Sequence, residues 1–243
     1  MAQDSQLSAG AFDPWRSDRP LIVYVDIKSP YAFVSLEPTL AMARRLGIAI
    51  DWRPLTLDIP SYLGSARKDD SGRVVESRRS SSQWDAVRYA YRDARRYAEL
   101  QGHTLRGTTK IWDSSLAHIG LRWAVRQSDE VLGAYLGRVY PAFWRRELDI
   151  EDERIIEAEL AAAGGDVAGF RAWARGEGRR EHEAMQAAIF EAGIFGVPAY
   201  VVPGSTDRGE WFFGREHLPQ VAWLLGGCDG PLPDVAYPLP ETA

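Results

Sequence analysis

The chain has few of the residues that build disulfides or metal sites. Its 243 residues include one cysteine, Cys228, and four histidines. A single cysteine excludes an internal disulfide framework and any Cys-x-x-Cys pair. With so few histidines and no His-Glu-x-x-His spacing, we expect no dedicated metal site.

Other features are also missing. The formal net charge is −5, and the absence of a basic tail or an interleaved basic and aromatic array argues against nucleic acid as a partner. No apolar run is long enough to span a membrane. Residues 1–20 lack the pattern of a secretory signal, so we expect a flexible lead-in and a cytoplasmic protein. The 45% of hydrophobic residues suits one soluble globular domain.

A strand and a helix are predicted at the start of the folded region. Leu21–Ile27 is a nearly continuous apolar run, which is typical of a buried strand. Apolar residues then recur at helical spacing over Tyr31–Leu46, with Ser29 as the expected N-cap and Pro30 at the first helical position. Alternation over 48–52 predicts a second strand, and the order β-α-β implies a parallel pair. Pro38 is expected to kink or restart the helix.

The predicted cap has two interpretations. Ser29 places a hydroxyl beside the free backbone N–H groups of a helix N-terminus, where an anion such as a thiolate or a carboxylate is stabilised. Serine followed by proline is also common as a plain cap without any chemistry. The residues alone leave both interpretations open.

The middle of the chain is predicted to be a helical block. The stretch 54–83 has no periodicity, and we expect a mobile lid or a disordered segment there. Helices are predicted over 84–100, 113–126, 129–144, 149–163, 166–174 and 179–192. The aromatics of 129–144 are expected in the core or in a dimer interface: Tyr135, Tyr140, Phe143 and Trp144. His182, between two glutamates, is expected on the surface.

The helix at 84–100 has a basic face. Its arginines are Arg88, Arg92, Arg95 and Arg96. A solvated face is the default expectation for such a pattern. The alternative is that one of these arginines faces an anion.

Strand signals return after the helical block. Strands are predicted over 199–202 and 210–213, with a hairpin turn at 205–209 and a closing helix over 216–225. The fold class is therefore α/β, with one domain in two halves, 21–57 and 193–226, separated by a large all-helical insertion at 58–192. Residues 227–243 form a proline-rich tail.

This layout resembles the thioredoxin-like fold with a helical insertion of the disulfide-oxidoreductase A superfamily. That superfamily has Cys-x-x-Cys where this chain has Ser29-Pro30-Tyr31-Ala32, so dithiol–disulfide exchange is excluded at this position. Ser-Pro-Tyr-Ala resembles the 2-hydroxychromene-2-carboxylate isomerase family and the related kappa-class glutathione transferases. Further matches are Gly196-Val197-Pro198, Phe213-Gly214 followed by an acidic residue, and the spacing of Tyr89, Asp93, Arg96 and Ala98.

The resemblance implies a glutathione-dependent isomerase that acts on a small molecule as a homodimer. Ser29 would be the catalytic residue that activates the glutathione thiolate. Glutathione itself would bind at a cis Val197-Pro198 bond and at Arg215 and Glu216. Lys28 and Tyr31 flank the site and are candidates for orienting a substrate carboxylate. The alternatives are a kappa-type glutathione transferase or peroxidase, and a non-catalytic thioredoxin-like binding protein.

The sequence departs from the family pattern at four positions. Glu216 and His217 replace the usual aspartate and arginine of the late motif. Ala86 stands where the family often has lysine, and Asp113 where it usually has asparagine. A carboxylate at position 113 disfavours an anionic substrate group unless it is paired. These changes bear on the cofactor and the substrate, whereas the predicted fold does not depend on them.

Overall fold

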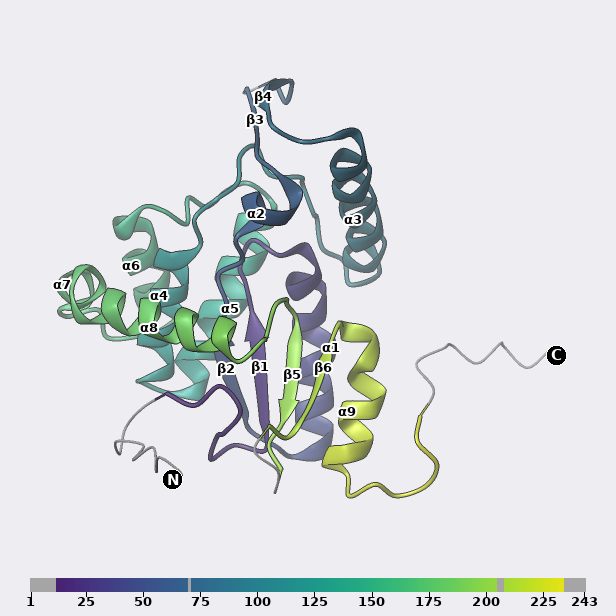
Figure 1. The fold of residues 1–243 in the computed structure, drawn as a ribbon. Helices are drawn as coiled ribbons and strands as arrows, with labels where there is room; N and C mark the ends of the chain where they lie inside the picture. Colours follow the sequence, from purple (N-terminus) through teal and green to yellow (C-terminus); the bar gives the residue numbers. More distant parts are fainter. Residues whose placement is uncertain (1–11, 70, 205–207, 234–243) are drawn as a thin grey trace, which may run out of the picture.

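Four strands form the central sheet of the computed structural model, which describes residues 12–69, 71–204 and 208–233 (Figure 1). The strands are β1 (Leu21–Val25), β2 (Ile50–Pro54), β5 (Ala199–Val202) and β6 (Glu210–Phe213), in the order β2-β1-β5-β6. β1 pairs with β2 in parallel, and β5 is antiparallel to both of its neighbours. The predicted α/β fold with a parallel first pair of strands is confirmed.

α1 (Pro30–Leu46) connects the parallel strands. It begins after Ser29 and ends at Gly47, which has a left-handed φ of 66° that glycine adopts without a Cβ clash. The helix continues through Pro38, so the predicted restart at that residue is wrong. α1 packs against α9 (Leu218–Leu225) of the second half and against α3 (Ser81–Leu100) of the insertion.

The insertion contains the remaining long helices. These are α3 (Ser81–Leu100), α4 (Ser115–Val125), α5 (Asp129–Trp144), α6 (Glu153–Ala162), α7 (Phe170–Arg175) and α8 (Glu177–Glu191). α4 contacts β2, α5 and α8, and so joins the insertion to the sheet. The aromatics of α5 are at most 3% exposed and belong to the core of this chain.

The segment 54–83 contains regular secondary structure, so the alternative of a disordered stretch is wrong. It contains α2 (Ile59–Leu63) and a hairpin of β3 (Ala66–Lys68) and β4 (Val74–Ser77), which projects beyond α2 (Figure 1). Lys68 N donates to Thr109 O at 2.7 Å, and Arg78 N donates to Ser65 O at 2.8 Å. Because the first of these partners is distant in sequence, local periodicity does not reveal the hairpin.

The expected flexible lead-in does not hold for residues 12–20, which pack on the sheet. Arg53 of β2 donates to the carbonyls of Asp13 and Arg16, both at 2.6 Å, and Tyr24 donates to Pro14 O at 2.6 Å. Trp15 joins the core at 9% exposure. Residues 1–11 of the lead-in, 205–207 of the predicted turn and 234–243 of the tail lie outside the described residues.

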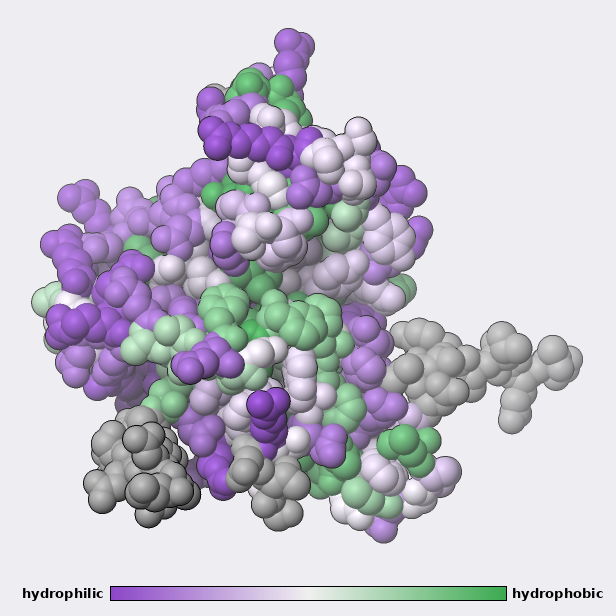
Figure 2. Space-filling model, in the orientation of Figure 1, coloured by the Kyte–Doolittle hydropathy of each residue, from purple (hydrophilic) through white to green (hydrophobic). Residues whose placement is uncertain are grey.

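The surface in Figure 2 has a hydrophobic area at its centre, over the chain that leads from α8 into β5. Phe195 and Phe213 are 60% and 45% exposed, and their ring centroids lie 5.2 Å apart. Trp211 meets Phe195 at 5.5 Å. Within the described part of the chain, no helix has the length and apolar content needed to cross a membrane.

Candidate functional site

Ser29 caps α1 as predicted. It is 5% exposed, and its Oγ accepts a hydrogen bond from Ala32 N at 3.2 Å. Because this bond uses a lone pair of the hydroxyl oxygen, the hydroxyl proton remains available for a second acceptor. Ser29 is therefore arranged both to hold the helix start and to donate to an anion.

The first turn of α1 leaves one further donor. Pro30 has no N–H, and the N–H groups of Ala32 and Phe33 bind Ser29 Oγ and Ser29 O. The N–H of Tyr31 has no hydrogen-bond partner among the described residues. The positive end of the helix dipole thus presents a backbone N–H and the serine hydroxyl, a combination that favours a bound anion.

The second half of the domain brings a cis-proline beside this helix start. The Val197–Pro198 bond is cis, as expected from the resemblance. In the antiparallel register Ala199 faces Tyr24, so Val197 lies alongside the residues that follow β1. In the described regions nothing pairs with the N–H or C=O of Val197, which is 4% exposed. An extended peptide can pair with this short backbone edge.

Glu216 and Arg215 have different surroundings. A Cβ at Gly214 would lie 2.4 Å from both carboxylate oxygens of Glu216, so that carboxylate rests directly on Gly214. Gly214 N donates to Pro198 O at 3.0 Å, which places Glu216 at the cis-proline end of the site. The Arg215 guanidinium instead lies 3.6 Å from the ring centroid of Tyr97 on α3.

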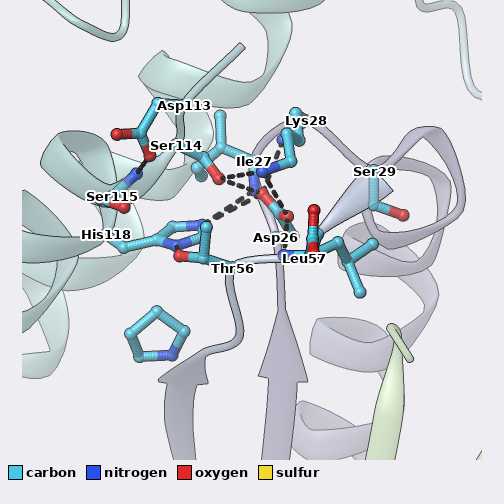
Figure 3. Close-up of polar contacts among 12 residues, drawn as sticks. Asp26, Ile27, Lys28, Ser29, Thr56, Leu57, Asp113, Ser114, Ser115 and His118 are labelled. Carbon is cyan, nitrogen blue, oxygen red and sulfur yellow. Dashed lines mark hydrogen bonds and ion pairs between the residues drawn. The ribbon is translucent and has the colours of Figure 1, made fainter. Parts of the chain in front are cut away.

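A buried charge cluster lies behind the helix start (Figure 3). Asp26 is fully buried and accepts hydrogen bonds from Lys28 N at 3.0 Å, Leu57 N at 2.9 Å and Ser114 Oγ at 2.7 Å. Lys28 Nζ lies 3.5 Å from Asp26 Oδ2 and donates to Ser114 Oγ at 3.2 Å. The Ser29 side chain points away from this cluster (Figure 3).

The cluster keeps Asp26 ionised. Burial alone would raise the pKa of Asp26, but the Lys28 ammonium, His118 and the Ser114 hydroxyl together outweigh burial and hold the pKa below its usual range. The Asp26 carboxylate in turn balances the charge of the Lys28 ammonium. We identified Lys28 from the sequence but missed Asp26 as a site residue. The sequence feature that could have identified Asp26 is its position, a carboxylate directly after a continuous apolar strand.

Two histidines extend the cluster toward α8. His118 Nε2 lies 3.2 Å from Ile27 N and 3.3 Å from Asp26 Oδ1, and its Nδ1 is hydrogen-bonded to Thr56 Oγ1 at 2.7 Å. Thr56 Oγ1 is also hydrogen-bonded to His182 Nε2 at 3.1 Å. Burial lowers the pKa of His182 to about 3. The prediction that His182 lies on the surface is wrong, since it is 2% exposed.

The remaining predicted site residues are held by protein contacts. Tyr31 OH donates to Asp93 Oδ2 at 3.2 Å, and burial together with Asp93 raises the pKa of Tyr31. Asp113 Oδ1 accepts from Ser115 N at 2.9 Å. Ala86 is exposed on α3. Among the residues that the structure describes, no group of three or more His, Cys, Asp and Glu side chains is placed to hold a metal ion.

Several solved structures have a similar fold. A 2-hydroxychromene-2-carboxylate isomerase has a TM-score of 0.60 and 20% identity, over 86% of this chain and 95% of that chain. A probable DsbA oxidoreductase from Streptomyces coelicolor has a TM-score of 0.63 and 20% identity, over 88% and 93%. The cytosolic disulfide reductase DsbM from Pseudomonas aeruginosa has a TM-score of 0.56 and 18% identity, over 86% and 96%. At these identities the likeness shows the fold alone.

The comparison with curated proteins finds no match. A family model does match, and it covers both halves of the domain together with the insertion. This model describes a DSBA-like thioredoxin domain and matches residues 20–226. The chain therefore belongs to the DSBA-like thioredoxin domain family.

Proposed function

We propose that the protein is a glutathione-dependent isomerase of the 2-hydroxychromene-2-carboxylate type. The observation that carries the proposal is the geometry of Ser29. Its hydroxyl accepts from Ala32 N and keeps its own proton for an anion at the N-terminus of α1. The positions that hold two thiols in a dithiol enzyme are Ser29 and Ala32 here, so the reactive sulfur must come from a bound molecule.

The residues present fit glutathione. The unpaired N–H and C=O of Val197 suit the extended cysteinyl unit of the tripeptide. Glu216, at the same end of the site, suits the ammonium of the γ-glutamyl unit. Arg215 is held over Tyr97, and we assign it the γ-glutamyl carboxylate. When bound, glutathione supplies a thiolate that adds to a conjugated carbon and is later eliminated, so the net reaction is isomerisation.

The chain's part in this chemistry is to favour the thiolate. A free thiol has a pKa of roughly 8.5, and lowering it by about two units requires about 2.7 kcal/mol. A hydrogen bond to a charged group contributes about 1.5–3 kcal/mol, and a helix N-terminus about 0.3–1 kcal/mol. The Ser29 hydroxyl and the Tyr31 N–H together reach the required range.

Lys28 has a supporting electrostatic role. The buried Asp26 carboxylate would oppose a second negative charge at the helix start. The Lys28 ammonium, 3.5 Å from Asp26 Oδ2, balances that charge. A glutathione-dependent reaction suits the cytoplasm, and we also propose a homodimer. The α5 aromatics do not supply its interface, because they are buried within one chain.

The test follows the conversion of 2-hydroxychromene-2-carboxylate with and without glutathione, in wild type, Ser29→Ala and Ser29→Asp. Aspartate caps a helix as well as serine but offers no proton at neutral pH. Both variants should lose about tenfold to a hundredfold in turnover, as expected when a charge-assisted hydrogen bond is lost. Ser35→Ala is the matched control, a buried serine of the same helix that binds Ala32 O at 2.8 Å.

The outcomes separate the alternatives. Full activity in Ser29→Ala would overturn the proposal. Release of a glutathione thioether in place of an isomer would indicate a kappa-type transferase. Turnover without glutathione would show that the reaction does not require this cofactor. If glutathione did not bind at all, a non-catalytic binding protein would be the better assignment.

A further inference from the structure

A cleft leads from the N-terminus of α1 to the surface, between α3, the β3–β4 hairpin and the segment 107–112. It consists of two adjoining cavities. The inner cavity, of about 100 Å³, is lined by Lys28 and Pro30, the neighbours of Ser29. The outer cavity, of about 180 Å³, is lined by Lys68 and Arg95. The two share the lining residues Arg79, Val87, Tyr91, Thr108, Lys110 and Ile111.

The charge in this cleft is of one sign. Among the residues that the structure describes, no aspartate or glutamate lines either cavity, although the chain as a whole has a net charge of −5. The cations of the outer cavity are Lys68, Arg79, Arg88, Arg95 and Lys110. Arg88 pairs with Asp85, and Lys110 pairs with Glu151. The other three have no carboxylate partner in the described parts of the chain.

The unpaired arginines are held by groups that leave their charge free. The Arg79 guanidinium lies 5.0 Å from the ring centroid of Trp84, and its Nε donates to Gly64 O at 3.3 Å. Arg95 lies 5.8 Å from the centroid of Tyr91, and its Nε donates to a backbone carbonyl at 3.0 Å. Each guanidinium is thus oriented through one nitrogen and a ring, and its terminal nitrogens remain for a ligand.

The inner cavity has a different character. Most of its lining is apolar or aromatic, including Ile59, Leu63, Val87 and Trp112. An apolar or aromatic body is the kind of group that such a wall binds. A ligand that spans both cavities therefore has an apolar end near Lys28 and Pro30, at the start of α1, and an anionic end near the hairpin.

We infer that the outer cavity binds a phosphate group at the end of an amphipathic molecule whose apolar body lies in the inner cavity. A phosphate monoester carries a charge of about −1.5 to −2 at neutral pH, which suits several unpaired cations better than a carboxylate does. Guanidinium groups also bind phosphate oxygens in a bidentate manner. The identification of this molecule as the substrate rests on the proposed function. On that basis the natural substrate extends beyond a chromene carboxylate by a phosphate-bearing end.

The test is calorimetric titration of the full chain with 1-naphthyl phosphate, 1-naphthoate, 1-naphthol and inorganic phosphate. Affinity should fall in the order phosphate ester, carboxylate, alcohol. Added salt should lower the affinity for the phosphate ester more than that for the other two. Arg79→Gln should lower the affinity for 1-naphthyl phosphate about tenfold, because a hydrogen bond to a charged group is lost. The matched control is Arg78→Gln, which removes the same charge from an adjacent, exposed residue outside both cavities.

A second pair of variants tests the opposite wall. Arg95→Gln should also weaken the phosphate ester, whereas Arg92→Gln, on the same helix but outside the cleft, should leave its affinity unchanged. Equal affinities for the ester and 1-naphthol, or equal effects of each variant and its control, would overturn the inference. These titrations contain no glutathione and measure no turnover. A failed isomerase assay therefore leaves their result standing, and a failed titration leaves the Ser29 assay standing.

Discussion

Ser114 Oγ donates a 2.7 Å hydrogen bond to Asp26 Oδ1 across 88 residues of sequence. The same hydroxyl oxygen accepts from Lys28 Nζ at 3.2 Å. Ser114 precedes α4 and Asp26 follows β1, so this contact joins the helical insertion to the sheet directly behind the candidate site. The position of Lys28 therefore depends on both parts of the chain.

Asp26→Asn should destabilise the protein by about 3–5 kcal/mol, because it leaves the Lys28 ammonium nearly buried without a counter-charge. The two side chains have the same shape, but the amide also replaces one of the two oxygens that accept from Lys28 N, Ser114 Oγ and Leu57 N, so part of the loss comes from those hydrogen bonds. The double variant Asp26→Asn with Lys28→Met should lose less than the single variant, because no unpaired ion remains. Urea unfolding monitored by circular dichroism measures these differences.

Asp58→Asn is the control for this cycle. Asp58 is exposed and makes no side-chain capping bond at the start of α2, so its change should stay within about 0.5 kcal/mol. A double variant as unstable as Asp26→Asn would show that the ion pair is not the source of the loss.

His182 should make stability depend on pH. Its pKa is lowered from 6.5 to about 3 in the folded protein, so the unfolded chain binds a proton first as the pH falls. Stability from this residue is retained above pH 6.5 and is lost progressively as the pH falls from 6.5 toward 3. Between pH 7 and pH 5 the loss from this residue should be about 2 kcal/mol. Urea unfolding at pH 7, 6 and 5 measures it.

His182→Gln should remove this part of the pH dependence. His103→Gln is the control, because His103 is partly exposed and bonds to Glu37 outside the buried cluster. An unchanged slope in His182→Gln would mean that a different group produces the loss of stability on acidification.

The predictions that succeeded rest on local pattern. Ser29-Pro30 before an apolar helical repeat, and Gly47 after it, determine where α1 begins and ends. Each of these features acts through backbone geometry within one turn. The cis Val197–Pro198 bond was expected from family resemblance alone, because composition does not indicate a cis isomer.

The predictions that failed depend on partners distant in sequence. The β3–β4 hairpin is fixed partly by Thr109, and buried His182 is hydrogen-bonded to Thr56, which lies 126 positions away in sequence. A single window of sequence contains one member of each contact. The same reason explains why Asp26 was missed, since its role depends on Ser114. It also explains why the basic face of α3 did not show that Arg95 lines a cleft.

Gly64→Ala should disturb the base of the hairpin. Gly64 has a φ of 62°, and an added Cβ would lie 2.7 Å from Arg78 O. Gly72, at the hairpin tip, has a φ of 83°, but no atom of the described residues beyond its chain neighbours lies within 4 Å of an added Cβ. Alanine at either position has the unfavourable φ, which costs about 1–3 kcal/mol, and the clash is confined to position 64.

Limited proteolysis and 1-naphthyl phosphate titration measure this difference. Gly64→Ala should speed proteolytic cleavage between β3 and α3. It should also weaken the binding of the phosphate ester, because Gly64 O orients Arg79. Gly72→Ala should leave the affinity unchanged. Equal affinities of the two variants for 1-naphthyl phosphate would show that the base of the hairpin does not influence binding in the cleft.

The Glu216 carboxylate rests on Gly214 beside the cis-proline, where it is placed to bind the ammonium of glutathione. Calorimetric titration with glutathione at neutral pH should show micromolar to low-millimolar binding to wild type. Glu216→Ala should weaken glutathione binding about tenfold through loss of one charge-assisted hydrogen bond. The affinity of Glu216→Gln should lie between those of wild type and Glu216→Ala. Glu210→Ala, which removes an exposed carboxylate from β6, is the control. Binding that Glu216→Ala leaves unchanged would mean that the longer glutamate does not replace the family's aspartate. Failure of wild type to bind would leave a substrate with its own thiol as the remaining source of sulfur beside Ser29.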